Sequence, residues 1–196
     1  MKFKFPYLLL FAFLRMTTIQ AESGFGVPAP ESDNFTVYIF LGEECIISQQ
    51  YTLLLRQLHS TYSSDRVNFI GLFPNPSSNE KKMETFKGKY QLPFELKQDF
   101  LQQEMDRFGI KVTPEVVVFN ESKKEVVYQG RIDNMFFRVG KRRTVTTTSE
   151  LEDVLEKIKN QELIIFHKTQ AVGCFITPLD ADLKNIQMCK TIDGGR

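Results

Sequence analysis

Cysteine is the residue type in this sequence that is best suited to covalent chemistry. The 196-residue chain has three cysteines, Cys45, Cys174 and Cys189, and only two histidines. A deprotonated cysteine is a nucleophile toward disulfides and a ligand for metals. Neither His59 nor His167 lies in a cluster with the spacing of a metal site, so we interpret both as packing or surface residues. The sequence also lacks nucleotide-binding glycine loops and a haem attachment motif, so neither a metal nor a cofactor is predicted.

Cys45 lies at the boundary between two hydrophobic patterns, within the segment GEECIIS at residues 42–48. The apolar run at 35–41 predicts a buried strand, and after Cys45 apolar residues recur at helical spacing. A thiolate at a helix N-terminus faces unpaired N–H groups and the positive end of the helix dipole, which lowers its pKa. Glu43 and Glu44 act in the opposite direction. We therefore expect a moderately reactive thiol, with an unreactive packed thiol as the alternative.

The elements that must position Cys45 alternate along the chain. The hydrophobic pattern predicts a helix after Cys45. It then predicts a strand at 67–73, a helix at 79–90, an extended or irregular piece at 93–100, a short helix at 102–108, strands at 115–119 and 125–130, and a helix at 150–159. Ser149 is predicted to cap the last helix, with Glu152 three residues later. This order predicts an α/β fold with a central mixed sheet of four to five strands flanked by helices, followed by a C-terminal extension.

The N-terminal segment has the pattern of a targeting sequence. Residues 1–21 carry three basic residues, no acidic residue and a short apolar run, which predicts a signal peptide rather than a permanent membrane span. A flexible leader at 22–33, a folded domain at 34–176 and a tail at 177–196 complete the predicted organisation. Removing residues 1–21 leaves 22 basic and 24 acidic residues, a formal charge of −2, so binding to nucleic acid is not predicted.

Basic and acidic residues are nearly equal in number, but one short segment contains a cluster of basic residues. It consists of Arg138, Lys141, Arg142 and Arg143. A solvated face with a structural ion pair and a site for an anion or a partner are both compatible with such a cluster.

The order of elements, together with three motifs, resembles the thioredoxin-like proteins. The motifs are Val112-Thr113-Pro114, Gly130-Arg131-Ile132-Asp133 and Gly173-Cys174, and they resemble most the peroxiredoxin-like (redoxin, AhpC/TSA-type) branch, which occurs mostly as exported bacterial proteins. The resemblance implies a periplasmic or extracellular location. It also implies a cis proline at Pro114 beside the active-site sulfur, where the backbone at Thr113 can pair with an extended peptide.

The resemblance places Cys45 and Ser48 at the two positions of the thioredoxin Cys-x-x-Cys motif. A serine can donate a hydrogen bond to a thiolate, but it cannot form the disulfide that releases a substrate. The peroxide-reacting cysteine of peroxiredoxins also corresponds to Ser48, so an ordinary peroxidase is disfavoured.

A resolving thiol must therefore come from elsewhere. Three pairings are open, Cys45 with Cys174, Cys45 with Cys189, and Cys174 with Cys189. The first is favoured because Gly173-Cys174 belongs to the segment that resembles the family.

Two functions follow as hypotheses. The first is an exported thiol-disulfide oxidoreductase or redox-responsive protein, in which Cys45, Ser48, Thr113, Pro114 and Cys174 form the site and the partner is a protein or small-molecule thiol or disulfide. The second is a binding or structural module that keeps the fold without turnover.

Overall fold

A computed structural model describes residues 33–181, 183 and 184 of the chain. The predicted signal peptide, nearly all of the leader and Cys189 lie outside the described residues. Among those described, no helix is long and apolar enough to cross a bilayer.

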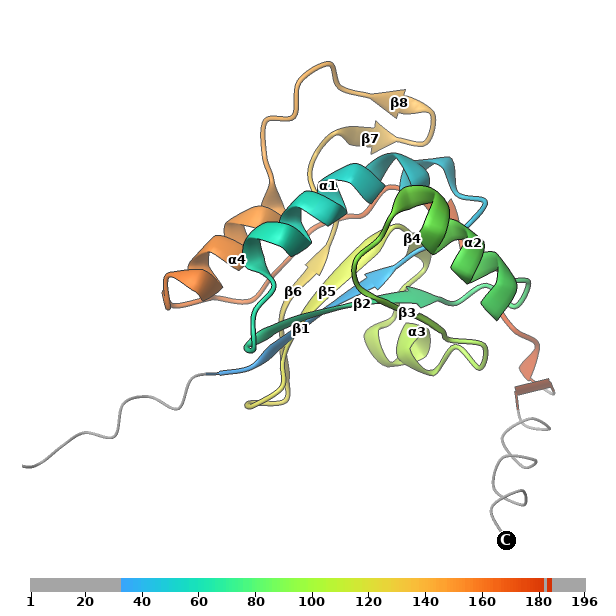
Figure 1. Cartoon of the computed structure of the whole chain (residues 1–196), viewed down its shortest axis with the longest axis horizontal. Coiled ribbons are helices and arrows are strands. Elements are labelled where there is room, and N and C mark those ends of the chain that lie inside the picture. The colour runs from blue at the N-terminus through green and yellow to red at the C-terminus, as the bar shows by residue number, and fades with distance from the viewer. Residues whose placement is uncertain (1–32, 182, 185–196) are drawn as a thin grey trace, which may run out of the picture. The chain divides into compact units, whose positions relative to one another are not determined.

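A six-stranded mixed sheet forms the centre of the fold (Figure 1). The strands are β1 (Phe35–Phe40), β2 (Val67–Phe73), β3 (Glu95–Gln98), β5 (Glu115–Asn120), β6 (Glu125–Gly130) and β9 (His167–Lys168), in the spatial order β3-β2-β1-β5-β6-β9. β1, β2 and β3 are parallel, β5 is antiparallel to β1 and to β6, and β9 runs parallel to β6. The mixed α/β sheet is confirmed, and its size exceeds the predicted four to five strands because β3 and β9 join its edges.

Helices cover both faces of this sheet. They are α1 (Ile46–Tyr62), α2 (Glu80–Tyr90), α3 (Gln103–Phe108) and α4 (Glu150–Lys159). The first, second and fourth pack on one face through a large apolar cluster that includes Val37, Leu55 and Leu155. α3 packs on the other face, where Phe108 meets Phe40 of β1. The alternation of buried side chains along β1 and β5 thus feeds two cores, one on each side.

Ser149 does not cap α4 in the way that the sequence predicted. It occupies the N-cap position, but its side chain makes no capping hydrogen bond. Glu150 instead accepts hydrogen bonds from Thr148 Oγ1, at 2.8 Å, and from Arg131 Nε, at 2.9 Å. The helix start is therefore fixed by a tertiary ion pair rather than by a local capping box.

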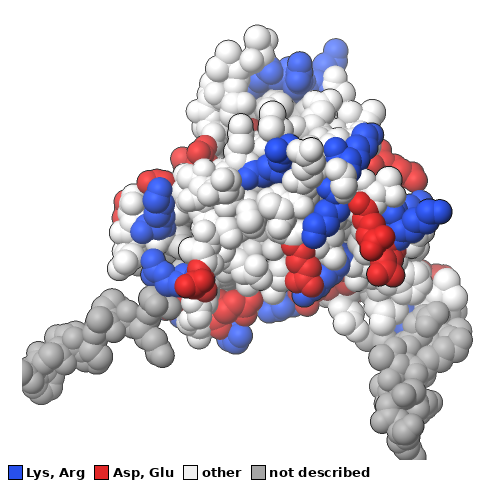
Figure 2. Space-filling view, viewed as in Figure 1, with Lys and Arg blue, Asp and Glu red and all other residues white. Residues whose placement is uncertain are grey.

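Two small ribbons lie outside the main sheet. β4 (Val112–Thr113) pairs with β10 (Cys174–Phe175), and β7 (Phe136–Arg138) pairs with β8 (Lys141–Arg142). The surface carries both signs of charge, and Lys and Arg side chains gather at the top of the molecule, where Figure 1 places β7 and β8 (Figure 2). The first ribbon brings residues of the candidate site together, as described next.

Candidate active site around Cys45 and Cys174

Cys45 is the N-cap residue of α1 and lies almost fully buried where the loop after β1 enters the helix. Its sulfur accepts a hydrogen bond from the backbone N–H of Ser48, at 3.5 Å. The thiol also donates to the carbonyl oxygen of Thr113, at 3.1 Å. The helix predicted to start after Cys45 is therefore confirmed, and the sulfur occupies the end of α1 where unpaired N–H groups stabilise negative charge.

Ser48 takes part in this site through its backbone and through its hydroxyl. The hydroxyl oxygen accepts a hydrogen bond from the backbone N–H of Gly42, at 3.3 Å, and the side chain is fully buried. Because Gly42 opens the loop that carries Cys45, this bond ties the two ends of the loop together. Ser48 thus holds the geometry of the segment that presents the sulfur.

The peptide bond between Thr113 and Pro114 is cis, as the resemblance implied. The backbone edge beside it is not open to an added peptide, which corrects the expectation for Thr113. β10 occupies this edge in antiparallel register, with Cys174 opposite Thr113 and Phe175 opposite Val112. A hydrogen bond of 3.1 Å from Ile176 N–H to the carbonyl oxygen of Lys111 extends the pairing. The chain's own C-terminal segment thus lies where an extended peptide was expected.

This register places Cys174 opposite Thr113, whose carbonyl oxygen accepts the hydrogen bond from the Cys45 thiol, so that both cysteines line one pocket. Both are free thiols in the structure, so the favoured disulfide is not formed in this state. Cys189 lies outside the described residues, so the two disulfide pairings that involve it stay untested.

The two thiols differ in how readily they ionise. Burial raises the pKa of Cys45, but hydrogen bonds from Cys174 and from Ser48 outweigh it, so that the pKa of Cys45 is lowered. Burial and the neighbouring Cys45 sulfur together raise the pKa of Cys174 to about 12. The opposite directions of these two pKa shifts make Cys45 the more acidic of the two thiols.

A pocket of about 220 Å³ opens onto the two sulfurs. It is lined by both cysteines together with Glu43, Glu44, Asn75, Ser77, Thr113, Phe175 and Thr177. Its lining contains no basic residue and is mostly polar. Glu43 Oε2 accepts a hydrogen bond from Ser78, at 2.8 Å, while Glu43 Oε1 and Thr113 Oγ1 are buried without a partner among the described residues. These two atoms belong to residues that line the pocket, but the atoms themselves are buried.

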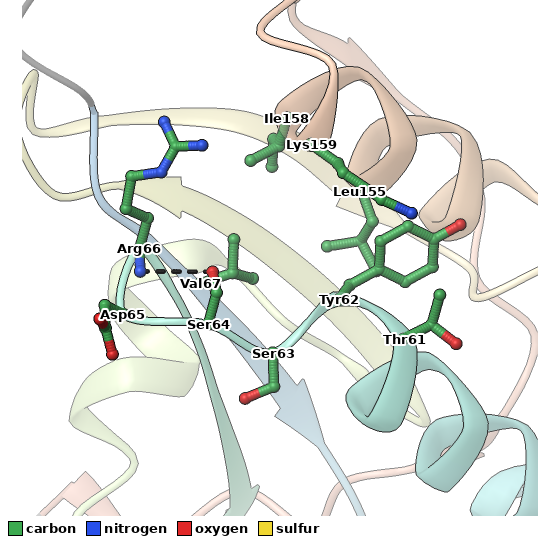
Figure 3. Close-up of a pocket in the computed structure, with 10 residues that line it drawn as sticks. All are labelled: Thr61, Tyr62, Ser63, Ser64, Asp65, Arg66, Val67, Leu155, Ile158 and Lys159. Carbon is green, nitrogen blue, oxygen red and sulfur yellow. Dashed lines mark hydrogen bonds between the residues drawn. The ribbon is translucent and has the colours of Figure 1, made fainter.

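A larger pocket, of about 530 Å³, lies at the opposite end of α1, between the turn into β2 and α4 (Figure 3). Tyr62, Arg66 and Lys159 are among its lining residues, and it contains no cysteine. Because α1 has 17 residues, this pocket is about 25 Å along the helix from Cys45. It does not contribute to the thiol site.

The two histidines lie elsewhere in the fold. His59 packs against the rings of Phe69 and Phe94, and burial lowers its pKa. His167 lies against Tyr128 at 4.7 Å between ring centroids. Among the described residues, no group of histidine, cysteine and carboxylate side chains is arranged to hold a metal ion.

The comparisons with known proteins support the fold. No family model matches the sequence, and a search of curated proteins gave no match. An uncharacterized conserved protein from Geobacillus kaustophilus is 19% identical, with a TM-score of 0.65 over 76% of this chain and 80% of its own. A hypothetical protein from Sinorhizobium meliloti 1021 is 16% identical, with a TM-score of 0.63 over 74% of this chain and 80% of its own. These likenesses show the fold alone, a central mixed sheet flanked by helices, and the strand order and the cis proline agree with the thioredoxin-like fold that the sequence resembles.

Proposed function

We propose that this protein is a thiol-disulfide oxidoreductase whose two redox thiols are Cys45 and Cys174. The observation that carries the proposal is that β10 places Cys174 opposite Thr113, the residue that the Cys45 thiol contacts, so that both cysteines line one pocket; the lowered pKa of Cys45 and the raised pKa of Cys174 agree with it. A nucleophile and a resolving thiol require this difference, because the first must be a thiolate when the substrate arrives.

The proposed exchange has two steps. The Cys45 thiolate attacks one sulfur of a substrate disulfide, and the other substrate sulfur leaves as a thiolate that takes up a proton. Cys174 then loses its proton and attacks the Cys45 sulfur of the mixed disulfide, which releases the second substrate thiol. Two electrons pass to the substrate, and the protein is left with a Cys45–Cys174 disulfide that a separate thiol donor reduces.

The position of β10 bears on the partner in this exchange. Because β10 occupies the edge beside Pro114, a protein substrate needs this segment to move, whereas a small thiol or disulfide needs only the pocket of about 220 Å³. Access through the pocket favours a small partner. Its two glutamates favour one without excess negative charge.

The branch of the family, the export of the protein and the absence of peroxidase activity are proposed from the sequence. The motifs at Val112–Pro114, Gly130–Asp133 and Gly173-Cys174 support membership of the peroxiredoxin-like branch, and the pattern of residues 1–21 supports export to the periplasm or exterior. Ser48 stands at the position of the peroxide-reacting cysteine, which argues against peroxidase activity.

A non-catalytic binding module is the second candidate function. The observation that favours it is also β10, because a segment that permanently covered the site would leave Cys45 inaccessible to any disulfide. The two candidates therefore differ in whether Cys45 reacts.

Reduction of a model aromatic disulfide, followed by absorbance, separates these candidates. Beyond the single thiol that Cys189 can release, pre-reduced wild type is expected to release two thiols per chain, and Cys45→Ser none. Cys174→Ser is expected to stop at a mixed disulfide on Cys45, detectable by mass spectrometry. Cys189→Ser is the matched control and should behave as wild type. Equal rates for wild type and Cys45→Ser would refute the enzymatic proposal and leave the binding module.

A further inference from the structure

The β7–β8 ribbon projects from the body of the fold as a separate two-stranded hairpin (Figure 1). Phe136 lies opposite Arg142, and Arg138 lies opposite Lys141. The turn between the strands is Val139-Gly140, where Gly140 adopts a φ of +74° that favours glycine.

The base of this hairpin is anchored in the core. Phe136 is buried and packs edge-on against the ring of Tyr51, with 5.5 Å between centroids. The carboxylate of Asp133 accepts hydrogen bonds from the Tyr51 hydroxyl and from Met135 N–H. Arg143 N–H closes the base by donating to the carbonyl oxygen of Met135, at 2.7 Å. The fold thus holds the hairpin at a fixed position.

The hairpin, in contrast, presents apolar side chains to solvent. Phe137 in β7 and Val139 in the turn are 50% and 63% exposed, and Val145, in the segment after β8, is 68% exposed. Val139 lies at the turn itself, the part of the hairpin that extends farthest from its anchored base. Side chains this exposed contribute little to packing within the chain; Phe137 contacts the guanidinium of Arg143, which lies 5.5 Å from its ring centroid.

The basic cluster surrounds these apolar side chains. Arg138, Lys141, Arg142 and Arg143 are all exposed, and none of them forms an ion pair within the described part of the chain. The sequence from Asn134 to Ser149 contains no acidic residue. Without this cluster, 21 of the 25 basic residues remain against 24 acidic ones. Positive charge is therefore concentrated on the hairpin, as the top of Figure 2 shows.

From this combination we propose that the β7–β8 hairpin docks onto an anionic lipid surface. Val139 and Phe137 enter the boundary between headgroups and acyl chains, and the four cations contact lipid phosphates. A nucleic acid or another soluble polyanion would use the cations but would gain nothing from an apolar residue at the turn. A membrane with anionic lipids has negative headgroups outside and an apolar layer inside. The basic flanks of the hairpin match the headgroups, and its apolar turn matches the apolar layer.

The expected effects follow from the two kinds of contact. Each cation near an anionic membrane strengthens binding about fivefold, so removing three weakens binding by roughly 100-fold. Replacing Val139 by serine weakens binding by about tenfold, because a buried valine side chain is lost from the apolar layer. Because the effect of the cations is electrostatic, binding also falls as salt is raised.

Vesicle flotation tests the proposal with the full chain, using phosphatidylglycerol–phosphatidylcholine vesicles and pure phosphatidylcholine vesicles. The triple variant Arg138→Gln, Lys141→Gln, Arg142→Gln is compared with a matched triple variant on exposed lysines of α2, namely Lys81→Gln, Lys87→Gln, Lys89→Gln. The first should lose binding to anionic vesicles and the second should keep it. Equal binding by both variants would overturn the proposal.

A fluorescence measurement reports on the tip directly, because the chain contains no tryptophan. Val139→Trp should show a blue-shifted emission with anionic vesicles and quenching by brominated lipid. Leu53→Trp, at a 59% exposed position of α1, should show neither. The proposal would be overturned by either of two results. The first is an unshifted emission of Val139→Trp with anionic vesicles. The second is competition by heparin that abolishes vesicle binding while Val139→Ser leaves heparin binding unchanged, because the hairpin would then be a polyanion site.

Discussion

Gly173→Ala should separate the two thiols without unfolding the protein. A Cβ atom at position 173 would lie 2.1 Å from the carbonyl oxygen of Thr113 and 2.5 Å from its carbonyl carbon. Both are backbone atoms and cannot rotate away. Gly173 itself does not adopt a left-handed φ, so alanine adds a steric clash but no backbone strain.

The size of the effect follows from this clash. Ordinary contact begins at 3.4 Å, so β10 must retreat from β4 by about 1.3 Å at this position. The neighbouring Cys174 moves with it and loses its hydrogen bond to Cys45. A misplacement of about 1 Å between reacting groups costs roughly 100-fold in rate, so Cys174 should resolve a mixed disulfide on Cys45 that much more slowly. The separation also weakens the Cys45–Cys174 disulfide and should raise its reduction potential, by about 30 mV for each tenfold loss in the equilibrium constant.

Equilibration with reduced and oxidised glutathione, followed by acid quenching and mass spectrometry, measures this change. The alkylation rate of Cys45 against pH provides a second reading, because loss of the Cys174 hydrogen bond should raise the pKa of Cys45. Gly88→Ala is the matched control, since nothing lies within 4 Å of the added methyl group. If Gly173→Ala gave the wild-type redox equilibrium, the pairing of β10 with β4 would not be what positions the resolving thiol.

Three substitutions test the buried polar groups. Burial raises the pKa of Glu150, but hydrogen bonds from Arg131 outweigh it, so the pKa is lowered and the carboxylate stabilises the fold at neutral pH but not in acid. Glu150→Gln should therefore lower the free energy of unfolding in urea by about 1–2 kcal/mol at pH 7 and by little at pH 3. Burial raises the pKa of Glu115, so its contribution to the free energy of unfolding is lost as pH rises. Glu115→Gln should therefore be more stable than wild type at pH 7 and equal to it near pH 4. The opposite trend would contradict this assignment. Tyr51→Phe removes one of the hydrogen-bond donors to the buried Asp133 and leaves it the Met135 N–H; it should lower the melting temperature more than Tyr62→Phe, whose hydroxyl contacts the less buried Glu156.

The main elements could be predicted from the sequence because their side chains carry strong periodic patterns. β2 at 67–73 and α4 at 150–159 have the predicted bounds, and α1 begins after Cys45 as predicted. β3 was predicted only as an extended or irregular piece, because its four residues are mostly exposed and show no alternation between core and solvent. Its place in the sheet comes from parallel pairing with β2, which involves backbone groups that a hydrophobic pattern does not report.

The candidate site could be predicted in its members but not in its closure. Cys45, Ser48, Thr113 and Cys174 lie together in the structure, and their roles in catalysis stay a prediction. The cover over the Thr113 edge could not be foreseen, because β10 has only two residues and Phe175 in it is 83% exposed. Such a strand is defined by its partner rather than by its own sequence.

The remote position of Cys174 changes what the missing second cysteine of a Cys-x-x-Cys motif implies. In such a motif both thiols belong to one helix turn, and their separation is fixed by that turn. Here the second thiol arrives on β10, which is held at this edge by backbone pairing and by the side chain of Gln102, whose amide binds Thr177 and Leu179. Because this segment is short and near the surface, the contact between the thiols is easier to break than a helix turn. If Cys45 and Cys174 form the proposed redox pair, formation of their disulfide depends on the position of this segment, and Gly173→Ala tests that dependence.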